Sequence, residues 1–297
     1  MFSYRHAFHA GNHADVLKHL ILLASARHLA QKETALHYVD THAGAGLYRL
    51  DGDFARSSGE AQEGYFQLRR QLSGQLVTPA LEDYLGVVEH FSQGGARQIY
   101  PGSPFILCHL MRSQDRLRLF ELHPTDIKSL KGNIAQLNVA ATVHVDREDG
   151  FEALKKHLPP PSRRALVLCD PSYELKEDYR RVVDTIEDAL KRFATGTYLI
   201  WYPIIPRAQA HELPKRLKIL ADRAQRPWLN ATLTVKSSKF LRDESGELKR
   251  PGLPASGMMV INPPYTLAEL LAPALAQVSQ CLAQSKHAGY TIESGPA

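Results

Sequence analysis

A carboxylate, a proline and an aromatic ring follow one apolar stretch in the middle of this chain, and their spacing suits a reaction at a planar amine. Residues 165–169 are all apolar, and Asp170, Pro171, Ser172 and Tyr173 follow them directly. The carboxylate can accept one N–H, the backbone carbonyl at Pro171 can accept another, and the Tyr173 ring can stack on a base. The sequence therefore predicts Asp170, Pro171 and Tyr173 as catalytic residues.

The apolar run before Asp170 indicates a buried parallel strand, because it is continuous rather than alternating and ends at a proline that a central strand does not tolerate. In open α/β sheets, ligands bind at the carboxyl ends of the strands. We therefore expect residues at the ends of other predicted strands to share one crevice with Asp170.

A loop of small residues follows the predicted strand 35–39. This loop runs from Asp40 to Gly46 and contains His42 and Gly44, and its glycines allow the backbone to approach a ligand closely. The spacing G-x-G-x-x-G is absent from it, which argues against a hydride-transfer dinucleotide site. We expect a nucleotide-type ligand loop here.

Acidic residues end the next two predicted strands. Glu121 lies 81 residues after Asp40, and it suits ribose hydroxyls, although this separation requires an insertion of about 50 to 60 residues. Asp149, followed by Gly150, would accept a hydrogen bond from an adenine amine or would cap the next helix. Ser103 follows a rigid turn and would cap the helix after it or touch a ligand, and of these two roles we expect the cap.

The insertion is expected to be helical. Apolar residues recur at helical spacing over residues 60–72 and 79–91. We predict a Rossmann-like α/β domain formed by residues 1–52 and 99–297, with a small helical subdomain at residues 53–98. Its sheet would have seven strands, mostly parallel.

Composition indicates an ordinary globular chain of 297 residues with a net charge of +5, which suits a polyanionic partner without requiring one. Cys108, Cys169 and Cys281 are too few and too scattered for a disulfide framework, which fits the cytoplasm. His9 and His13 lie four apart but lack a suitably spaced carboxylate, so we expect no metal. The sequence shows neither an export signal nor an apolar run of about 18 residues, so we expect no membrane contact.

The order of these features resembles that of the class I S-adenosylmethionine-dependent methyltransferases. A closer resemblance, from Met1 into the last predicted strand, is to the bacterial 23S ribosomal RNA adenine-N6 methyltransferase J family. Five segments carry it: Gly11–His19, Asp40–Gly46, Pro101–Pro104, Glu121–Pro124 and Asp149–Phe151.

This resemblance implies S-adenosyl-L-methionine as the cofactor and 23S rRNA as the partner, in a protein that we expect to be monomeric. It implies that Asp170 is catalytic and that Tyr4 contacts the RNA, where we also expect Arg5. It further implies a cofactor site at His19, His42, Ser103, Glu121, Asp149 and Gly150. The close backbone approach expected of the loop 40–46 adds Gly44 to this site.

Two details of the motifs bear on the choice of catalytic residues. The family pattern has a second proline where this chain has Ser172, and its loss leaves both hydrogen-bond acceptors in place, so we expect a change in rate rather than in role. Asn262 to Tyr265 reads Asn-Pro-Pro-Tyr and matches the general amino-methyltransferase signature better. The resemblance implies that the last strand of the sheet is antiparallel and so ends away from the crevice, and we therefore expect this second motif to form a turn.

Three alternatives remain open from the sequence. A DNA adenine-N6 methyltransferase, or a protein linked to the use of external DNA, would employ the same site chemistry. A catalytically silent nucleic-acid-binding protein would keep the basic surface without turnover. A nicotinamide oxidoreductase is the least favoured, because the loop lacks the dinucleotide spacing.

Overall fold

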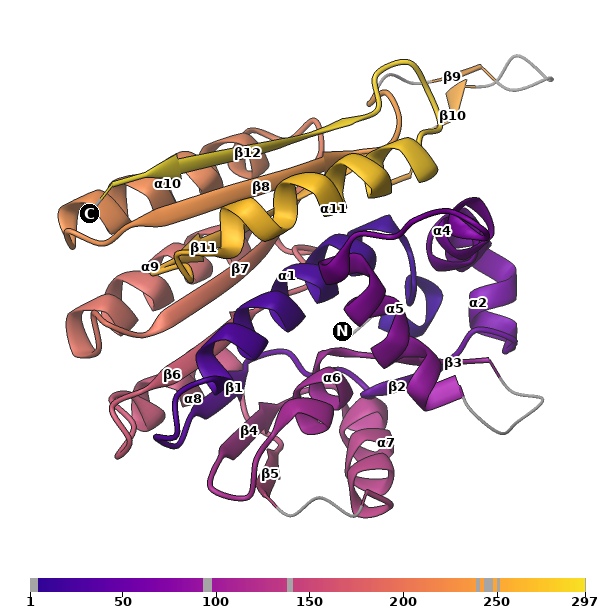
Figure 1. Cartoon of the computed structure of the whole chain (residues 1–297). Helices are drawn as coiled ribbons and strands as arrows, with labels where there is room; N and C mark the ends of the chain where they lie inside the picture. Colours follow the sequence, from indigo (N-terminus) through magenta and orange to yellow (C-terminus); the bar gives the residue numbers. More distant parts are fainter. Residues whose placement is uncertain are drawn as a thin grey trace.

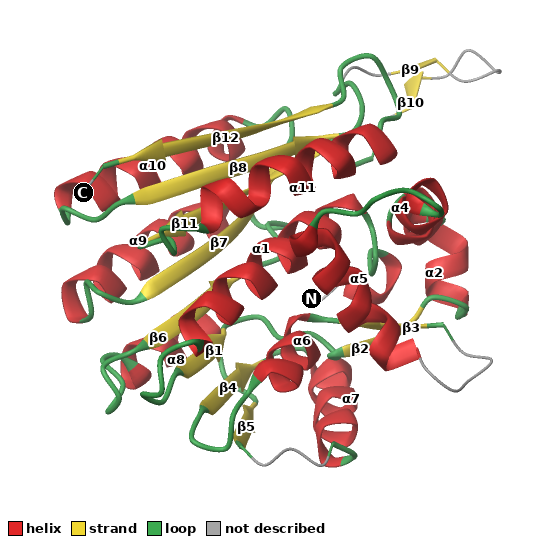
Figure 2. Ribbon diagram, viewed as in Figure 1, coloured by secondary structure: helices red, strands yellow, loops and turns green. Residues whose placement is uncertain are grey.

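A sheet of eight strands forms the centre of the molecule (Figures 1 and 2). The computed structural model describes residues 5–92, 98–137, 141–238, 241–242, 248–249 and 252–296. In spatial order the strands of this sheet are β12 (Gly289–Gly295), β8 (Trp228–Thr234), β11 (Ala255–Ile261), β7 (Thr197–Ile204), β6 (Ala165–Cys169), β1 (His37–Asp40), β4 (Arg116–Phe120) and β5 (Thr142–Asp146).

Strand directions confirm the predicted α/β class. The strands β5, β4, β1, β6 and β7 pair in parallel, whereas β11 runs antiparallel to both β7 and β8. The last predicted strand is therefore antiparallel, as expected. The sheet has eight strands rather than seven, because β12 adds an antiparallel edge to β8. That strand is largely exposed and has few apolar residues, so it lacks the pattern that reveals a buried strand.

Helices cover both faces of the sheet, and each face has its own hydrophobic core. One face carries α1 (His13–Ala30), α6 (Ser103–Leu110), α7 (Pro124–Ala135) and α11 (Leu267–Cys281). The other carries α8 (Gly150–His157), α9 (Lys176–Arg192) and α10 (Ala208–Arg223). Within the described residues, none of the helices is long and apolar enough to cross a membrane.

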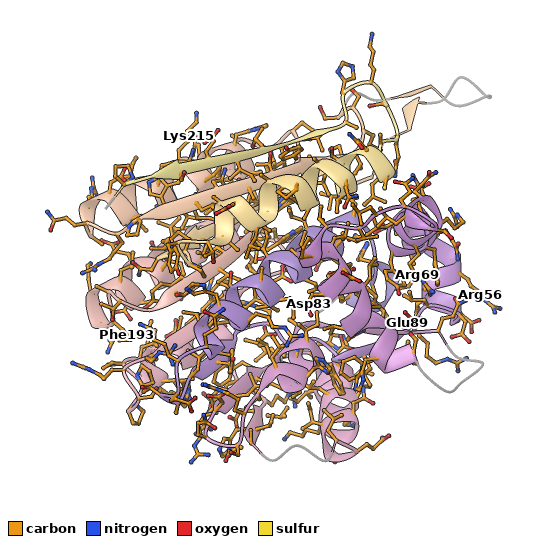
Figure 3. The ribbon with its side chains drawn as sticks, in the orientation of Figure 1. Arg56, Arg69, Asp83, Glu89, Phe193 and Lys215 are labelled. Carbon is orange, nitrogen blue, oxygen red and sulfur yellow. The ribbon has the colours of Figure 1, made fainter. Side chains whose placement is uncertain are left out.

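The expected insertion is helical. Between the short strands β2 (Leu47–Arg49) and β3 (Ile99–Pro101) lie α2 (Asp53–Ser58), α3 (Glu60–Glu63), α4 (Tyr65–Leu72) and α5 (Pro79–Ser92). Arg69 of α4 and Glu89 of α5 form an exposed ion pair at 3.7 Å (Figure 3). The inner sides of these helices join the core around α1, so the insertion packs on the main domain. Its standing as a separate subdomain stays a prediction.

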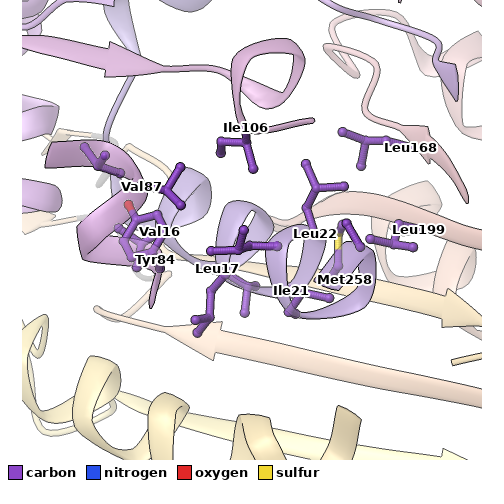
Figure 4. Close-up of a cluster of buried hydrophobic side chains, with 14 of the residues drawn as sticks. Val16, Leu17, Ile21, Leu22, Tyr84, Val87, Ile106, Leu168, Leu199 and Met258 are labelled. Carbon is purple, nitrogen blue, oxygen red and sulfur yellow. The ribbon is translucent and has the colours of Figure 1, made fainter. Parts of the chain in front are cut away.

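Helix α1 lies in the middle of this core. The side chain of Asn12 caps it by accepting hydrogen bonds from the backbone N–H groups of Ala14 and Asp15. Most of its residues are buried on every side, which is the pattern of a helix enclosed by other elements. Figure 4 shows Leu17 and Ile21 of this helix among side chains from the sheet, α5 and α6. This enclosure fixes where the amino-terminal turns of α1 present their polar residues.

Two short elements complete the described fold. The pair β9 (Leu241–Arg242) and β10 (Leu248–Lys249) forms a small antiparallel ribbon that projects from the body of the molecule (Figure 1). A single-turn 3-10 helix, η1 (His6–Phe8), precedes α1.

Candidate active site

Strand register brings the predicted acidic residues to one edge of the sheet. Asp40 of β1 pairs with Leu168 of β6, so Asp170 lies two residues beyond this pair. Asp40 also pairs with Leu119 of β4, which places Glu121 two residues beyond on the other side. Asp170 and Glu121 therefore lie on either side of the end of β1, where the strand order reverses, which is the usual ligand position in such folds.

A cavity of about 320 Å³ opens at this edge, which is within the size range of small-molecule sites. Its walls contain nine of the predicted site residues: His19, His42, Gly44, Ser103, Glu121, Asp149, Gly150, Asp170 and Pro171. They also contain residues that the sequence did not predict for the site, among them His6, Lys18, Thr41, Tyr48, Phe151 and Arg181.

Lys18 links α1 to the predicted catalytic carboxylate. Its Nζ lies 2.6 Å from Oδ2 of Asp170 and 2.9 Å from Oδ1 of Asp15. Nε2 of His6 lies 2.9 Å from the other oxygen of Asp15. Burial alone lowers the pKa of Lys18, but the two carboxylates raise it well above its usual range. The ammonium therefore stays charged and fixes the position of the Asp170 carboxylate.

His19 is fully buried one residue along the same helix. Its Nδ1 pairs with the hydroxyl of Tyr100 at 2.9 Å. Nε2 lies 3.9 Å from Oδ1 of Asp15 and has no hydrogen-bond partner among the described residues, although it is buried beside the cavity. Burial lowers the pKa of His19 to about 3, so the ring is neutral at pH 7. A ligand group in the cavity would satisfy this otherwise unpaired nitrogen.

A glycine and backbone hydrogen bonds to Glu121 fix the conformation of the loop after β1. Gly44 has φ +60°, and a Cβ there would lie 2.3 Å from the hydroxyl of Tyr48. The N–H of Gly44 donates to one carboxylate oxygen of Glu121 at 2.8 Å, and the N–H of His123 donates to the other at 2.6 Å. A carboxylate offers about four acceptor positions, so Glu121 retains capacity for ligand hydroxyls. Burial raises its pKa.

His42 occupies the same loop. Its Nδ1 lies 2.8 Å from the hydroxyl of Thr41, and its ring packs edge-on against Phe151 with centroids 4.7 Å apart. Burial lowers the pKa of His42 to about 4, so it is a neutral polar wall of the cavity at pH 7.

The expected capping role of Ser103 is wrong. Gly102 is the N-cap of α6, and the Ser103 hydroxyl instead donates to Oδ2 of Asp40 at 2.6 Å. This bond stabilises a carboxylate that is fully buried, where burial raises the pKa of Asp40 to about 6. The Ser103 hydroxyl bonds to Asp40 instead of capping its own helix, because Asp40 has no exposure to water and needs a partner inside the protein.

Asp149 does cap the following helix, which was one of the two expected roles. It accepts from the N–H of Phe151 at 3.0 Å, and its other oxygen accepts from Arg181 at 2.7 Å. The Arg181 guanidinium lies 4.4 Å from the centroid of the Phe151 ring. Gly150 packs directly on the loop after β1, since a Cβ there would lie 1.9 Å from the carbonyl oxygen of Thr41.

The predicted stacking role of Tyr173 needs correction. Tyr173 is 3% exposed and does not line the cavity. Its hydroxyl donates to the carbonyl of Trp201 at 2.6 Å, and its ring packs on Tyr179 with centroids 4.7 Å apart. A φ of 53° turns the side chain from the cavity wall into the core behind it. The ring supports the loop and offers no face to a base.

Of the two residues that we predicted to contact RNA, the structure describes one. Tyr4 lies outside the described residues. Arg5 is described and is half-buried, with its guanidinium 5.7 Å from the centroid of the Phe54 ring. It does not line the cavity, so a contact with RNA would occur outside it.

The second motif lies after the antiparallel strand β11, as expected. Asn262 has φ 53°, and its Nδ2 donates to the carbonyls of Ala194 and Gly196 at 2.8 and 2.6 Å. None of its four residues lines the cavity, and Tyr265 is 89% exposed. Asn262 thus holds a turn.

Sequence reasoning missed Lys18, Asp15 and His6 as site residues. One signal was available, because Asp15 and Lys18 lie three apart in the stretch 14–24, whose other residues are apolar except His19. Charged residues rarely lie in such a helix unless they are paired, so this pattern indicates a buried function. No local signal revealed that Asp170 is their partner.

Comparison with known proteins places the chain in a family. Residues 33–294 match the family model described as "Ribosomal RNA large subunit methyltransferase D, RlmJ". The chain belongs to this methyltransferase family. Two relatives named ribosomal RNA large subunit methyltransferase J are similar over almost its whole length. The Escherichia coli relative is 43% identical over 269 residues, which cover 91% of this chain and 90% of the relative. The Haemophilus influenzae relative is 40% identical over 294 residues, or 99% and 98% of the two chains.

A solved structure supports the fold of this chain. The crystal structure of a Legionella pneumophila protein assigned to the family DUF519 superposes with a TM-score of 0.84 at 30% identity. The alignment covers 97% of this chain and 98% of that protein. The family resemblance expected from the sequence is thereby confirmed.

Proposed function

We propose that this protein transfers a methyl group from S-adenosyl-L-methionine to an adenine N6 of 23S rRNA. The observation that carries the proposal is the position of Asp170, at the cavity wall beyond β6, with Oδ2 held by Lys18 at 2.6 Å. The names of the relatives support ribosomal RNA of the large subunit as the substrate.

The residues of the cavity fit the cofactor. The unpaired Nε2 of His19 can bond a polar group of it, and Glu121 can accept from ribose hydroxyls. Ser103, Asp149 and Gly150 complete the polar wall. When bound, S-adenosylmethionine supplies an electrophilic methyl group on a sulfonium.

Asp170 and Pro171 would act on the substrate. The lone pair of adenine N6 is shared with the ring, so the amine is a poor nucleophile. The Asp170 carboxylate and the Pro171 carbonyl would accept hydrogen bonds from the two N6 hydrogens, which localises the lone pair on nitrogen and stabilises the charge that develops there. The N–C bond would form as the carbon–sulfur bond of the sulfonium breaks, and N6 would then lose one proton to solvent by way of the Asp170 carboxylate. Lys18 keeps the carboxylate in place during this change.

The chemistry needs no metal, and we expect the protein to act as a monomer in the cytoplasm. The described residues contain no group of three or more His, Cys, Asp or Glu that could hold a metal ion. Target adenines inside a helix would have to be displaced, at a cost of a few kcal/mol.

A methyl-transfer assay tests the proposal. Labelled S-adenosylmethionine is offered with unmodified 23S rRNA or with duplex DNA to the wild type, Asp170→Ala and Tyr265→Ala. We expect label on adenine N6 of the RNA, abolished by Asp170→Ala and retained by Tyr265→Ala. Tyr265 represents the second motif here because its side chain is exposed, whereas Asn262 holds a turn.

Other outcomes are informative. Labelled DNA with unlabelled RNA would contradict the substrate. Activity that survives Asp170→Ala would contradict the site, and cofactor binding without any transfer would favour a silent binding protein.

A further inference from the structure

We propose that Phe54, held between Arg5 and Phe8, is a stacking platform for an RNA base next to the target nucleotide. This inference rests on the proposed function and extends it beyond the cavity. It assigns a substrate-binding role to α2, the first helix of the insertion.

Phe54 is partly exposed to solvent, with the Arg5 guanidinium over its ring. It is 44% exposed, although it is a large apolar side chain. Phe8 of η1 packs against it with centroids 4.8 Å apart and planes at 66°, which fixes the orientation of the ring. The Arg5 guanidinium lies 5.7 Å from the centroid. A single exposed phenylalanine is ordinary, but a ring that is packed on one side and accompanied by a guanidinium suits a base.

The platform adjoins the cavity through the three residues of η1. His6 lines the cavity and reaches Asp15, which holds Lys18. Its neighbours Arg5 and Phe8 contact Phe54 instead. His6 therefore lies in the cavity wall, whereas Arg5 before it and Phe8 after it contact the Phe54 ring. A strand that places one base in the cavity would have its next bases at this surface, where aromatic rings take successive bases.

Charge around the platform favours a nucleic-acid strand. Arg56 lies two residues after Phe54, is exposed, and points away from the body of the molecule (Figure 3). Arg5, whose guanidinium lies over the ring, and Arg56 are two cations of this region, and with Arg49 they outnumber its two carboxylates, Asp51 and Asp53. Guanidinium groups bind phosphate and also stack on bases, so both suit the backbone that follows a stacked base.

Tyr265 is a matched control. Its ring is 89% exposed and meets an edge-on aromatic neighbour, His28, with centroids 5.1 Å apart. It follows β11, whose direction takes it away from the cavity. Tyr265→Ala therefore measures the effect of losing an exposed aromatic ring away from the cavity, and Phe54→Ala measures the effect of losing the platform.

The test measures RNA affinity and cofactor affinity separately. Unmodified 23S rRNA is titrated against the wild type, Phe54→Ala, Phe54→Trp and Tyr265→Ala with S-adenosylhomocysteine present, and cofactor Kd is measured by calorimetry without RNA. We expect Phe54→Ala to raise the RNA Kd about tenfold. Phe54→Trp should retain affinity and show quenching of the new indole on RNA binding, and Tyr265→Ala should match the wild type. Cofactor Kd should be unchanged throughout.

Two results would overturn the platform. RNA affinity of Phe54→Ala equal to that of the wild type would show that no base stacks there. Equal losses of RNA and cofactor affinity in Phe54→Ala would assign the ring a structural role. If the wild type neither binds nor methylates the RNA, the proposed function fails and this inference fails with it.

Discussion

The Nζ atom of Lys18 lies 2.6 Å from Oδ2 of Asp170, although 152 residues separate them in the chain. The side chains are 6% and 14% exposed, so water screens the pair little. The same ammonium holds Asp15, which is 1% exposed. One buried cation thus joins α1 to the end of β6, and removing it leaves Asp170 without this counter-charge and Asp15 with its His6 contact alone.

Lys18→Met should therefore reduce both stability and catalysis. Breaking a buried pair costs about 3–5 kcal/mol, because the remaining charge is uncompensated. We expect a loss of this size in the free energy of unfolding, measured with urea, and a fall in kcat because Asp170 is no longer positioned. Arg27→Met is the control on the same helix, since its pair with Asp83 is exposed and worth at most about 1 kcal/mol. Equal losses in the two variants would contradict a special role for the buried cation.

Ser103→Ala should destabilise the protein in a pH-dependent way. Burial raises the pKa of Asp40 in the folded protein to about 6, above its value of about 3.9 in the unfolded chain. Between these two pH values the folded protein binds more protons than the unfolded chain, so stability falls as pH rises through that range. The Ser103 hydroxyl opposes this by donating to the charged carboxylate. Its loss should cost about 1–3 kcal/mol at pH 8 and less at pH 5, where Asp40 is mostly protonated. Urea unfolding at both pH values measures this.

Ser279→Ala is the matched control for that pH dependence. The Ser279 hydroxyl is also largely buried, but it donates to the carbonyl of Ala276 in its own helix. Its removal should have the same effect at both pH values. A Ser103→Ala effect that is likewise independent of pH would refute the role of Asp40.

The sequence predicted the sheet and the place of Asp170 because both follow from local patterns. A continuous apolar run indicates a buried parallel strand, and parallel strands end at one edge, so Asp170 and Glu121 could be brought together without coordinates. Strand β12 escaped this reasoning, since it is mostly exposed and lacks an apolar face.

Side-chain roles that depend on distant partners were not predictable in this way. Capping rules favoured Ser103 as a helix cap, but the buried carboxylate of Asp40 competes more strongly for its hydroxyl. An aromatic ring beside Asp170 suggested stacking, yet the positive φ of Tyr173 directs it into the core. Lys18 was overlooked because its partner lies 152 residues away.

His19→Gln should make the protein less sensitive to acid. Burial lowers the pKa of His19 in the folded protein to about 3, against about 6.5 in the unfolded chain. Below pH 6.5 the unfolded chain therefore takes up a proton that the folded protein does not, and stability falls as the pH drops. At pH 4.5 this penalty is about 2–3 kcal/mol, since one pKa unit is about 1.4 kcal/mol. We expect the difference in unfolding free energy between pH 7.5 and 4.5 to shrink by about this amount in the variant. An unchanged difference would show that another group dominates.

Gly150→Ala should disrupt the cofactor site by steric conflict alone. A Cβ at this position would lie 1.9 Å from the carbonyl oxygen of Thr41, whose N–H is bonded to Leu168 of β6, so the loop cannot simply move aside. We expect a loss of about 1–3 kcal/mol in stability and at least about a tenfold rise in cofactor Kd by calorimetry. Gly132→Ala on α7 meets no atom within 4 Å and should be neutral or stabilising by about 0.5–1 kcal/mol. Normal cofactor binding by Gly150→Ala would mean that the contact between α8 and the loop after β1 does not shape the site.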